Sequence, residues 1–426
     1  MKTLETRRIE RDPGPRAIWR ACAAGLATAA LVAAAFAAAA ATAGSAPAAK
    51  TAPVHPYLAR SARQPIFTLI PHKEISAAEL DAQATGHRTI PFWRDHVQSP
   101  LRPQYFTTTM AGDSPRTTHV PTVIQYVPIV ARIHFTDGTV LDPTVASNCD
   151  TVSPQVRFFN SPLFQRAKFR SNGVNVSEGV HGGTQFVSAF QRANYWSVVQ
   201  GTQYGIDLEP AAAPVVVDIL APVRSSQVFS FPIHCPNGTT PTINLGTMDI
   251  NAYDTIVENL IGKYSRPDQL PVVLTYNFVQ TAGGCCIIGY HNAIPVAGGT
   301  QTYAVGTYND PDIFTAPIQD IYAWTHEMSE WLDDPFVQAA VGGGGNNDVT
   351  PPWGHTGQVG GCQTNLETGD PLTGVATFHV QGAGGFIYTY QDEAFHDWFY
   401  RTPASGTGGK FSFKGVFSTD AGPRCH

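Results

Sequence analysis

The chain has 426 residues, of which 43% are hydrophobic, so it carries enough apolar material for a large core and is not a disordered chain. Only 14% of the residues are charged, and the 39 glycines and 33 prolines favour a loop-rich, β-leaning fold. The formal net charge is −6, although six of the 27 basic residues lie within the first 20 positions. The remaining chain is therefore distinctly acidic, which argues against nucleic acid as a partner.

The N-terminal segment predicts export. Basic residues are concentrated in 1–20, an Ala-rich apolar run follows in 21–43, and Ala41-Thr42-Ala43 supplies the small residues that precede a signal-peptidase cut. We interpret 1–43 as a cleaved signal peptide and expect a secreted or periplasmic protein. The alternative is an uncleaved anchor, because about 20 apolar residues can span a bilayer. Only in that case would the membrane be a partner.

Six cysteines follow the signal, and an even set in an oxidising compartment favours disulfides: Cys149, Cys235, Cys285, Cys286, Cys362 and Cys425. A bond between the adjacent Cys285 and Cys286 is expected to be strained. Each of these two is therefore expected to have a distant partner or to remain a buried thiol.

The chain divides into two parts beyond the signal. Residues 44–119 are Pro-rich and poorly periodic apart from a short helical pattern at 76–84, so they predict an extended arm or pro-segment. Residues 120–426 predict one folded domain, which begins with a β-branched and aromatic strand at 123–135.

The elements expected within this domain follow a mixed order. Strands are predicted at 215–220, 228–233 and 272–279, and amphipathic helices at 184–196 and 249–261. Because strands and helices do not alternate strictly, an α+β fold is favoured over a doubly wound sheet. The glycine run 342–345 lacks the Lys-Ser/Thr ending of a phosphate loop and is interpreted as a flexible loop.

The most informative segment is 317–335, predicted to be one helix bounded by prolines. It contains the pattern His326-Glu327-x-x-Glu330. His326 and Glu330 lie one turn apart on the same face and can touch one metal ion, whereas Glu327 is displaced sideways and can serve as general base for a metal-bound water. The alternative is a solvated acidic helix face. Asp333 and Asp334 argue against it, because negative charge is disfavoured at a helix C-terminus.

A third metal ligand must come from another segment. The downstream candidates are Asp348, His355, Glu367, Asp370 and His379. The residues alone leave this choice open.

The motif His326-Glu327-x-x-Glu330 with Asp334-Pro335, followed by Trp353-Gly354-His355, Gly361-Cys362-Gln363 and Leu366-Glu367-x-Gly369-Asp370, resembles a family of secreted, largely uncharacterised bacterial zincin-like proteins. It is more distantly similar to the phosphate-induced, exordium-like extracellular family. The resemblance implies a zincin-like α+β fold with a mixed or antiparallel sheet packed on the metal-site helix. It also implies a metal held by His326, Glu330 and Glu367, with Glu327 as base.

Zinc is the first choice of metal, and the two carboxylate ligands widen the choice to manganese or calcium. Five further residues are candidates for supporting roles, and His355 is one of them. Asp334 is a candidate to orient His326, and His291 a candidate to reach the site. Tyr390 and His396 are candidates to stabilise an oxyanion, with core packing as the competing interpretation.

These observations predict a secreted metal-dependent hydrolase, a peptidase or amidase acting on a peptide or other extracellular substrate. The alternative is a secreted binding or wall-associated module with a structural metal or none. A glycosidase is disfavoured, because Glu327 and Glu330 project to the same side of one helix and cannot flank a scissile bond. A disulfide from Cys362 to Cys285 or Cys286 is expected to pin the loop that carries Glu367.

Overall fold

The computed structural model describes residues 75–421 except 102, 104, 181, 316 and 338–365. The predictions for the signal peptide, Asp348, His355, Cys362, Cys425 and the glycine run 342–345 lie outside these residues. The helices are α1 (Ala77–Ala84), α2 (Pro154–Phe159), α3 (Phe186–Asn194), α4 (Trp196–Val199), α5 (Ile250–Tyr264), α6 (Tyr322–Asp333) and α7 (His396–Tyr400).

The strands are β1 (Phe92–Gln98), β2 (Tyr105–Ala111), β3 (Pro121–His134), β4 (Val140–Leu141), β5 (Arg170–Ser171), β6 (Val174–Asn175), β7 (Gly205–Pro210), β8 (Val215–Leu220), β9 (Ser226–Pro232), β10 (Thr242–Asp249), β11 (Leu270–Tyr276), β12 (Phe278–Thr281), β13 (Gly289–Val296), β14 (Gly299–Tyr308), β15 (Thr377–Gln381) and β16 (Ile387–Gln391). The largest sheet has seven strands in the order β13-β14-β11-β3-β4, and β7 and β8 pair with successive lengths of β3. Strands β14, β11 and β3 run parallel, whereas β13 and β4 are antiparallel to their neighbours. The mixed α+β prediction is confirmed.

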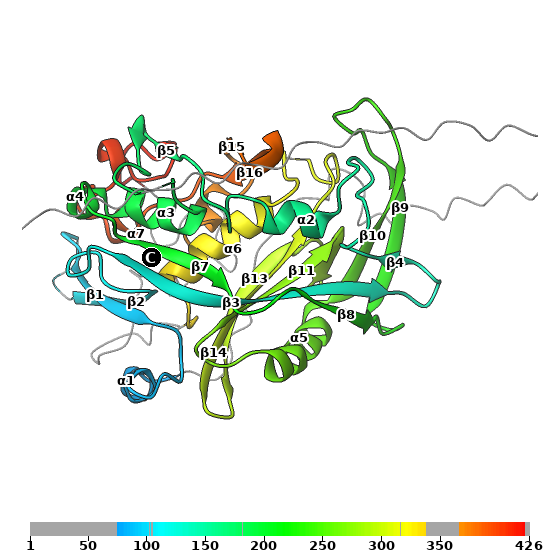
Figure 1. The fold of residues 1–426 in the computed structure, drawn as a ribbon, viewed down its shortest axis with the longest axis horizontal. Helices are drawn as coiled ribbons and strands as arrows, with labels where there is room; N and C mark the ends of the chain where they lie inside the picture. Colours follow the sequence, from blue (N-terminus) through cyan, green and yellow to red (C-terminus); the bar gives the residue numbers. More distant parts are fainter. Residues whose placement is uncertain are drawn as a thin grey trace, which may run out of the picture. The chain divides into compact units, whose positions relative to one another are not determined.

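Helices cover both faces of this sheet (Figure 1). Val272 and Leu274 of β11 join the core with α3 and α6, whereas Val273 between them joins the core with α5. A strand covered on both faces is apolar throughout rather than alternating, which explains the continuous apolar run of β11.

The strand predicted at 272–279 is two strands in two sheets. The chain turns at Asn277, which has a left-handed backbone (φ 44°) and donates its side-chain amide to Asp310 at 2.8 Å. Asparagine tolerates this conformation better than most residues, so it can interrupt a run of strand-forming side chains. Strand β12 beyond it belongs to the three-stranded sheet β12-β10-β9.

The boundary predicted at residue 120 is wrong in one respect, because part of the expected extension belongs to the fold. Strands β1 and β2 form an antiparallel hairpin, and β2 packs against α6. Phe106 is buried in a cluster with Leu366 and Trp398, and the Thr108 hydroxyl donates to the Asp333 carbonyl at 3.4 Å. Three consecutive buried threonines, 107–109, hide this strand from an apolar-pattern search.

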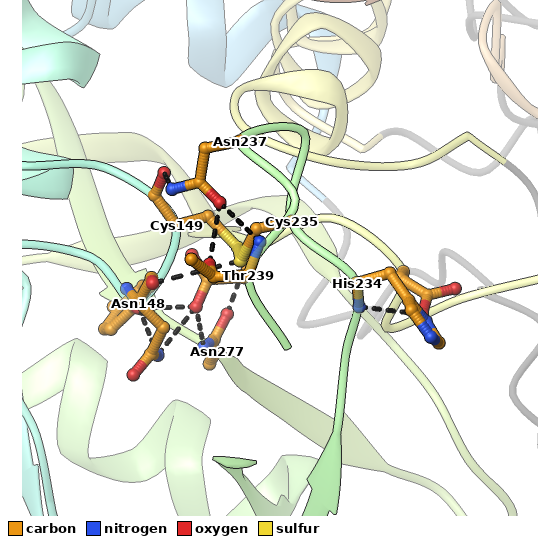
Figure 2. Close-up of a disulfide and its surroundings, with 10 residues drawn as sticks. Asn148, Cys149, His234, Cys235, Asn237, Thr239 and Asn277 are labelled. Atoms are coloured by element: carbon orange, nitrogen blue, oxygen red, sulfur yellow. Dashed lines mark hydrogen bonds and ion pairs between the residues drawn. A yellow bond between two sulfur atoms is a disulfide. The ribbon is translucent and has the colours of Figure 1, made fainter. Parts of the chain in front are cut away.

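Two disulfides are formed by the described cysteines. Cys149 and Cys235, with Cα atoms 5.3 Å apart, join the loops that follow β4 and β9 (Figure 2). Cys285 bonds to Cys286, which corrects the expectation that each has a distant partner. Both lie in the short loop closed by the backbone pairing of Gln280 with Ile287. Cys285 and Cys286 therefore do not supply the expected partner for Cys362.

No helix in the described part of the chain is both long and apolar enough to cross a membrane.

Candidate metal centre

Helix α6 is the structural foundation of the site. All twelve of its residues are buried, since it lies between the large sheet and α3, β2 and β16. The helix begins at Tyr322, later than the proline-based prediction of 317. Asp320 stands before it with a left-handed backbone, and its carboxylate accepts the N–H groups of Ile321 and Thr389 at 2.5 and 2.9 Å. Backbone pairing of Asp320 with Asn309 ties this segment to the end of β14.

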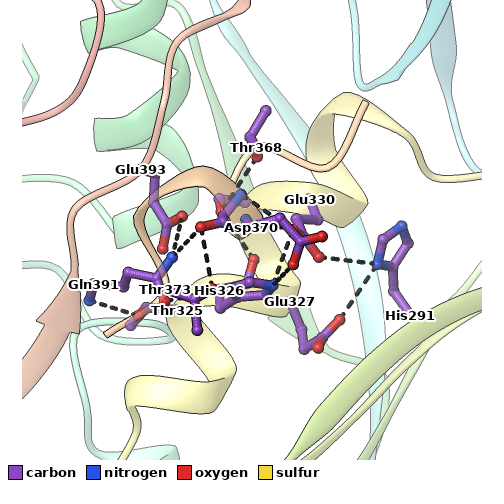
Figure 3. A network of polar contacts seen from close by, with 12 residues as sticks. His291, Thr325, His326, Glu327, Glu330, Thr368, Asp370, Thr373, Gln391 and Glu393 are labelled. Carbon is purple, nitrogen blue, oxygen red and sulfur yellow. Dashed lines mark hydrogen bonds and ion pairs between the residues drawn. The ribbon is translucent and has the colours of Figure 1, made fainter. Parts of the chain in front are cut away.

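His326 faces two carboxylates (Figure 3). Its Nε2 lies 2.9 Å from Glu330 Oε1 and 3.7 Å from Asp370 Oδ1. Its Nδ1 lies 3.2 Å from the side-chain oxygen of Gln391 on β16. A Cβ at Gly369 would collide with the imidazole ring, so the glycine of the Glu-x-Gly-Asp motif permits the loop to approach His326. Metal-binding histidines are commonly fixed in this way by a partner at the second ring nitrogen.

Glu330 lies between two histidines. Its Oε1, which faces His326, also accepts the backbone N–H groups of Gly369 and Asp370 at 3.1 and 3.2 Å. Its Oε2 lies 3.8 Å from Nδ1 of His291 on β13. The loop that carries the Glu-x-Gly-Asp motif is therefore docked on the helix through backbone hydrogen bonds.

Glu327 points toward the neighbouring sheet. Its Oε2 lies 3.3 Å from His291 Nδ1, and its Oε1 has no hydrogen-bond partner among the described residues. A Cβ at Gly289 would lie 2.7 Å from Glu327 Cγ, so this glycine of β13 makes room for the side chain. Strand β13 thus supplies both the space and the imidazole partner of Glu327.

Three groups of side chains in this region are close enough to hold a metal ion, with the ligand atoms of each group within 4.8 Å of one another. They are His326 with Glu330 and Asp370, His291 with Glu327 and Glu330, and His291 with Asp334 and Glu367. All the expected ligands, His326, Glu330 and Glu367, thus belong to one cluster. Asp370 completes the group of His326 and Glu330, however, whereas Glu367 lies with His291 and Asp334. The ligand role of Glu367 stays a prediction.

Burial dominates the electrostatics of the cluster. It raises the pKa values of Glu327, Glu330 and Glu367 well above their usual range, and repulsion from neighbouring carboxylates raises those of Glu327 and Glu367 further. Burial also lowers the pKa of His326 to about 4 and that of His291 to about 3. Both imidazoles are therefore neutral at pH 7, which is the form that binds a metal.

Three of the expected residues that the structure describes lie outside this cluster. Tyr390 packs against Phe186 and Phe378 in the core, as the packing interpretation predicted. His396 Nε2 lies 3.9 Å from Asp95 Oδ2, in a separate polar group. His379 is exposed on β15.

Sequence reasoning missed Gln391 and Glu393. Gln391 holds the His326 ring and also donates to the Gly369 carbonyl and to Glu393 at 3.2 Å. Both residues come at the end of an aromatic strand. A polar pair after a strand is too common a signal to identify a site.

No protein-family model, curated protein or solved structure matches this chain. The likeness to zincin-like families therefore depends on the motifs alone.

Proposed function

We propose that this protein is a metal-dependent hydrolase that cleaves peptide or other amide bonds outside the cytoplasm. The proposal rests on the contacts of the His326 ring. Its Nε2 faces the carboxylates of Glu330 and Asp370, and its Nδ1 is held by the side-chain oxygen of Gln391. One neutral imidazole and two carboxylates form an acceptable ligand set for zinc, and also suit manganese or calcium. We assign the third ligand position to Asp370, because it shares a ligand group with His326 and Glu330.

The remaining residues have distinct roles in this proposal. A divalent ion supplies Lewis acidity that makes water a nucleophile near neutral pH. Glu327, displaced from the ligand face, accepts the proton of that water through its unpaired Oε1. His291 holds the other carboxylate oxygen of Glu327 and so fixes its orientation.

The test uses the full chain, stripped with a chelator and reloaded separately with Zn²⁺, Mn²⁺ or Ca²⁺. We expect hydrolysis of a mixed peptide library to require one of these ions, and we expect His326→Ala to lose both the bound ion and the activity. Asp333→Asn is the matched control, since Asp333 lies on the same helix and is bonded to Gln191 and Asn194. Full metal content in His326→Ala would refute the assignment.

One observation favours a second candidate, a binding or wall-associated module with a structural metal. His326, Glu330 and Asp370 are at most 2% exposed, and structural metal sites are closed by protein. This candidate predicts a slowly exchanging ion whose removal unfolds the protein, with no hydrolysis in any metal form. Metal exchange and peptide cleavage measured on the same preparation separate the two.

The extracytoplasmic location rests on the predicted signal peptide and is supported by the Cys149–Cys235 disulfide, a bond that persists in oxidising compartments.

A further inference from the structure

Two complete sets of metal-binding side chains lie next to each other and share no residue. The first is His326 with Glu330 and Asp370, and the second is His291 with Asp334 and Glu367. Each set contains one imidazole and two carboxylates. The second set draws on β13, the residue that ends α6 and the Glu-x-Gly-Asp loop, so it is assembled from three separated parts of the chain.

The second set contains buried atoms that lack a partner. His291 is 0% exposed and Glu367 2% exposed. Nε2 of His291 and Oε1 of Glu367 meet no hydrogen-bond partner within the described ranges. Buried polar atoms in proteins are normally hydrogen-bonded or bound to an ion, so these two atoms point to a bound ligand. His291 Nδ1, by contrast, is occupied by Glu327, as in histidines that bind a metal through the other ring nitrogen.

The number of carboxylates matches two divalent ions. The two sets together hold four carboxylates, those of Glu330, Asp334, Glu367 and Asp370. When all four are ionised, one divalent ion cancels two of the negative charges and the other two require protons, whereas two divalent ions cancel all four. The strongest charged neighbours of Glu367 are Glu330, Asp370 and Asp334, which are all acidic.

Glu330 lies beside both histidines. Its Oε1 lies 2.9 Å from His326 Nε2, and its Oε2 lies 3.8 Å from His291 Nδ1, the nitrogen that also faces Glu327. The two sets are therefore neighbours, and two-metal hydrolytic sites hold their ions roughly 3.5–4 Å apart.

We propose that the cluster binds two divalent cations, one through His326, Glu330 and Asp370 and the other through His291, Asp334 and Glu367. This inference rests on the proposed metal site but not on hydrolysis. The second ion neutralises the carboxylates beside the first and gives the site a second Lewis acid for a substrate carbonyl.

The test begins with stoichiometry. The full chain is stripped, reloaded with Zn²⁺, freed of excess metal and analysed by elemental mass spectrometry. We expect about two ions per chain. The same protein loaded with Mn²⁺ should show the electron paramagnetic resonance signal of an exchange-coupled pair. One ion per chain, with an uncoupled manganese signal, overturns the proposal whatever the variants do.

Isosteric variants then assign the ions. Asp334→Asn and Glu367→Gln should each retain about one ion, and His326→Ala should retain the other, with Asp333→Asn keeping both as the matched neighbour. Loss of all metal in Glu367→Gln, with the fold intact by circular dichroism, would mean that Glu367 serves a single shared ion. Hydrolysis with one ion refutes only this inference, whereas two ions without hydrolysis refute only the proposed function.

Discussion

Two parts of α6 treat buried carboxylates in different ways. At the C-terminal end of the helix, Asp333 receives the side-chain amides of Gln191 at 2.6 Å and Asn194 at 3.5 Å, both from α3. In the central turns, Glu327 and Glu330 meet histidines and further carboxylates. All three acids are at most 1% exposed, so burial does not distinguish them.

The difference lies in what satisfies each acid. Neutral amide donors can stabilise one buried carboxylate without any counter-ion. In the central group, two backbone N–H groups reach Glu330 but do not offset the charge of several carboxylates beside neutral imidazoles, so this group must take up protons or cations. The first arrangement suits a structural role, and the second suits a site that binds metal. Substitutions in the two parts of the helix should therefore have separable effects.

The largest effect is expected at Glu327. Glu327→Gln keeps the size of the side chain and removes the proton acceptor, so kcat should fall about 10²–10⁴-fold while the metal content is unchanged. Steady-state kinetics together with metal analysis check this. Loss of the ion in this variant would show that Glu327 is a ligand instead.

A second prediction concerns the close approach of Gly369 to the His326 ring. Gly369→Ala places a methyl group against the imidazole ring, so metal affinity should fall about 10–100-fold, as for other losses of ligand positioning. Competition with a chromogenic chelator measures it. Gly262→Ala in α5 is the control, because a Cβ there meets nothing within 4 Å. Equal affinity in both variants would contradict the argument.

A substitution beside Asp333, at the C-terminal end of α6, should change stability alone. Gln191→Leu removes the shorter hydrogen bond to Asp333 and should lower the free energy of unfolding by about 1–3 kcal/mol, with metal content preserved. Denaturant unfolding of the metal-loaded protein provides the measurement. A loss of metal comparable to that of His326→Ala would mean that the two parts of the helix are not independent.

Asp320, before the start of α6, provides an effect that depends on pH. Burial raises its pKa to about 7, so the folded protein holds a proton there that the unfolded chain releases near pH 4. The stabilisation is complete below pH 4 and is lost as the pH rises through about 7. Asp320→Asn should match the wild type at pH 4 and exceed it at pH 8 by about 4 kcal/mol in the free energy of unfolding. A constant difference across this range in urea unfolding would disprove the titration.

The sequence predicted α6 and the shared face of His326 and Glu330 because both depend on local spacing. His326 and Glu330 share a face whatever the rest of the chain does, and the Glu-x-Gly-Asp motif directed attention to Glu367 and Asp370. The assignment of these two to different groups depends on how the loop docks through Gly369, which no spacing reveals.

The sequence did not reveal contacts between segments that are far apart along the chain. The β1–β2 hairpin was missed because its inward side chains include threonines, and Gln391 because its partner His326 is 65 residues away. The bond between Cys285 and Cys286 was not predicted, because a disulfide between adjacent cysteines was expected to be strained. Pairwise contacts between distant segments carry no periodic signal in one sequence.

The assembly of the centre from remote segments also dictates when it can form. The centre draws, in chain order, on His291, α6, the loop at 367–370 and Gln391. The contact between His326 and Gln391 can form only after residue 391 of the 426 has been synthesised. A nascent chain therefore presents only part of the ligand set during most of its synthesis. If the protein is exported before it folds, as the predicted signal peptide would allow, the proposed site would take its ion outside the cytoplasm, and the ions available there would decide which metal it binds.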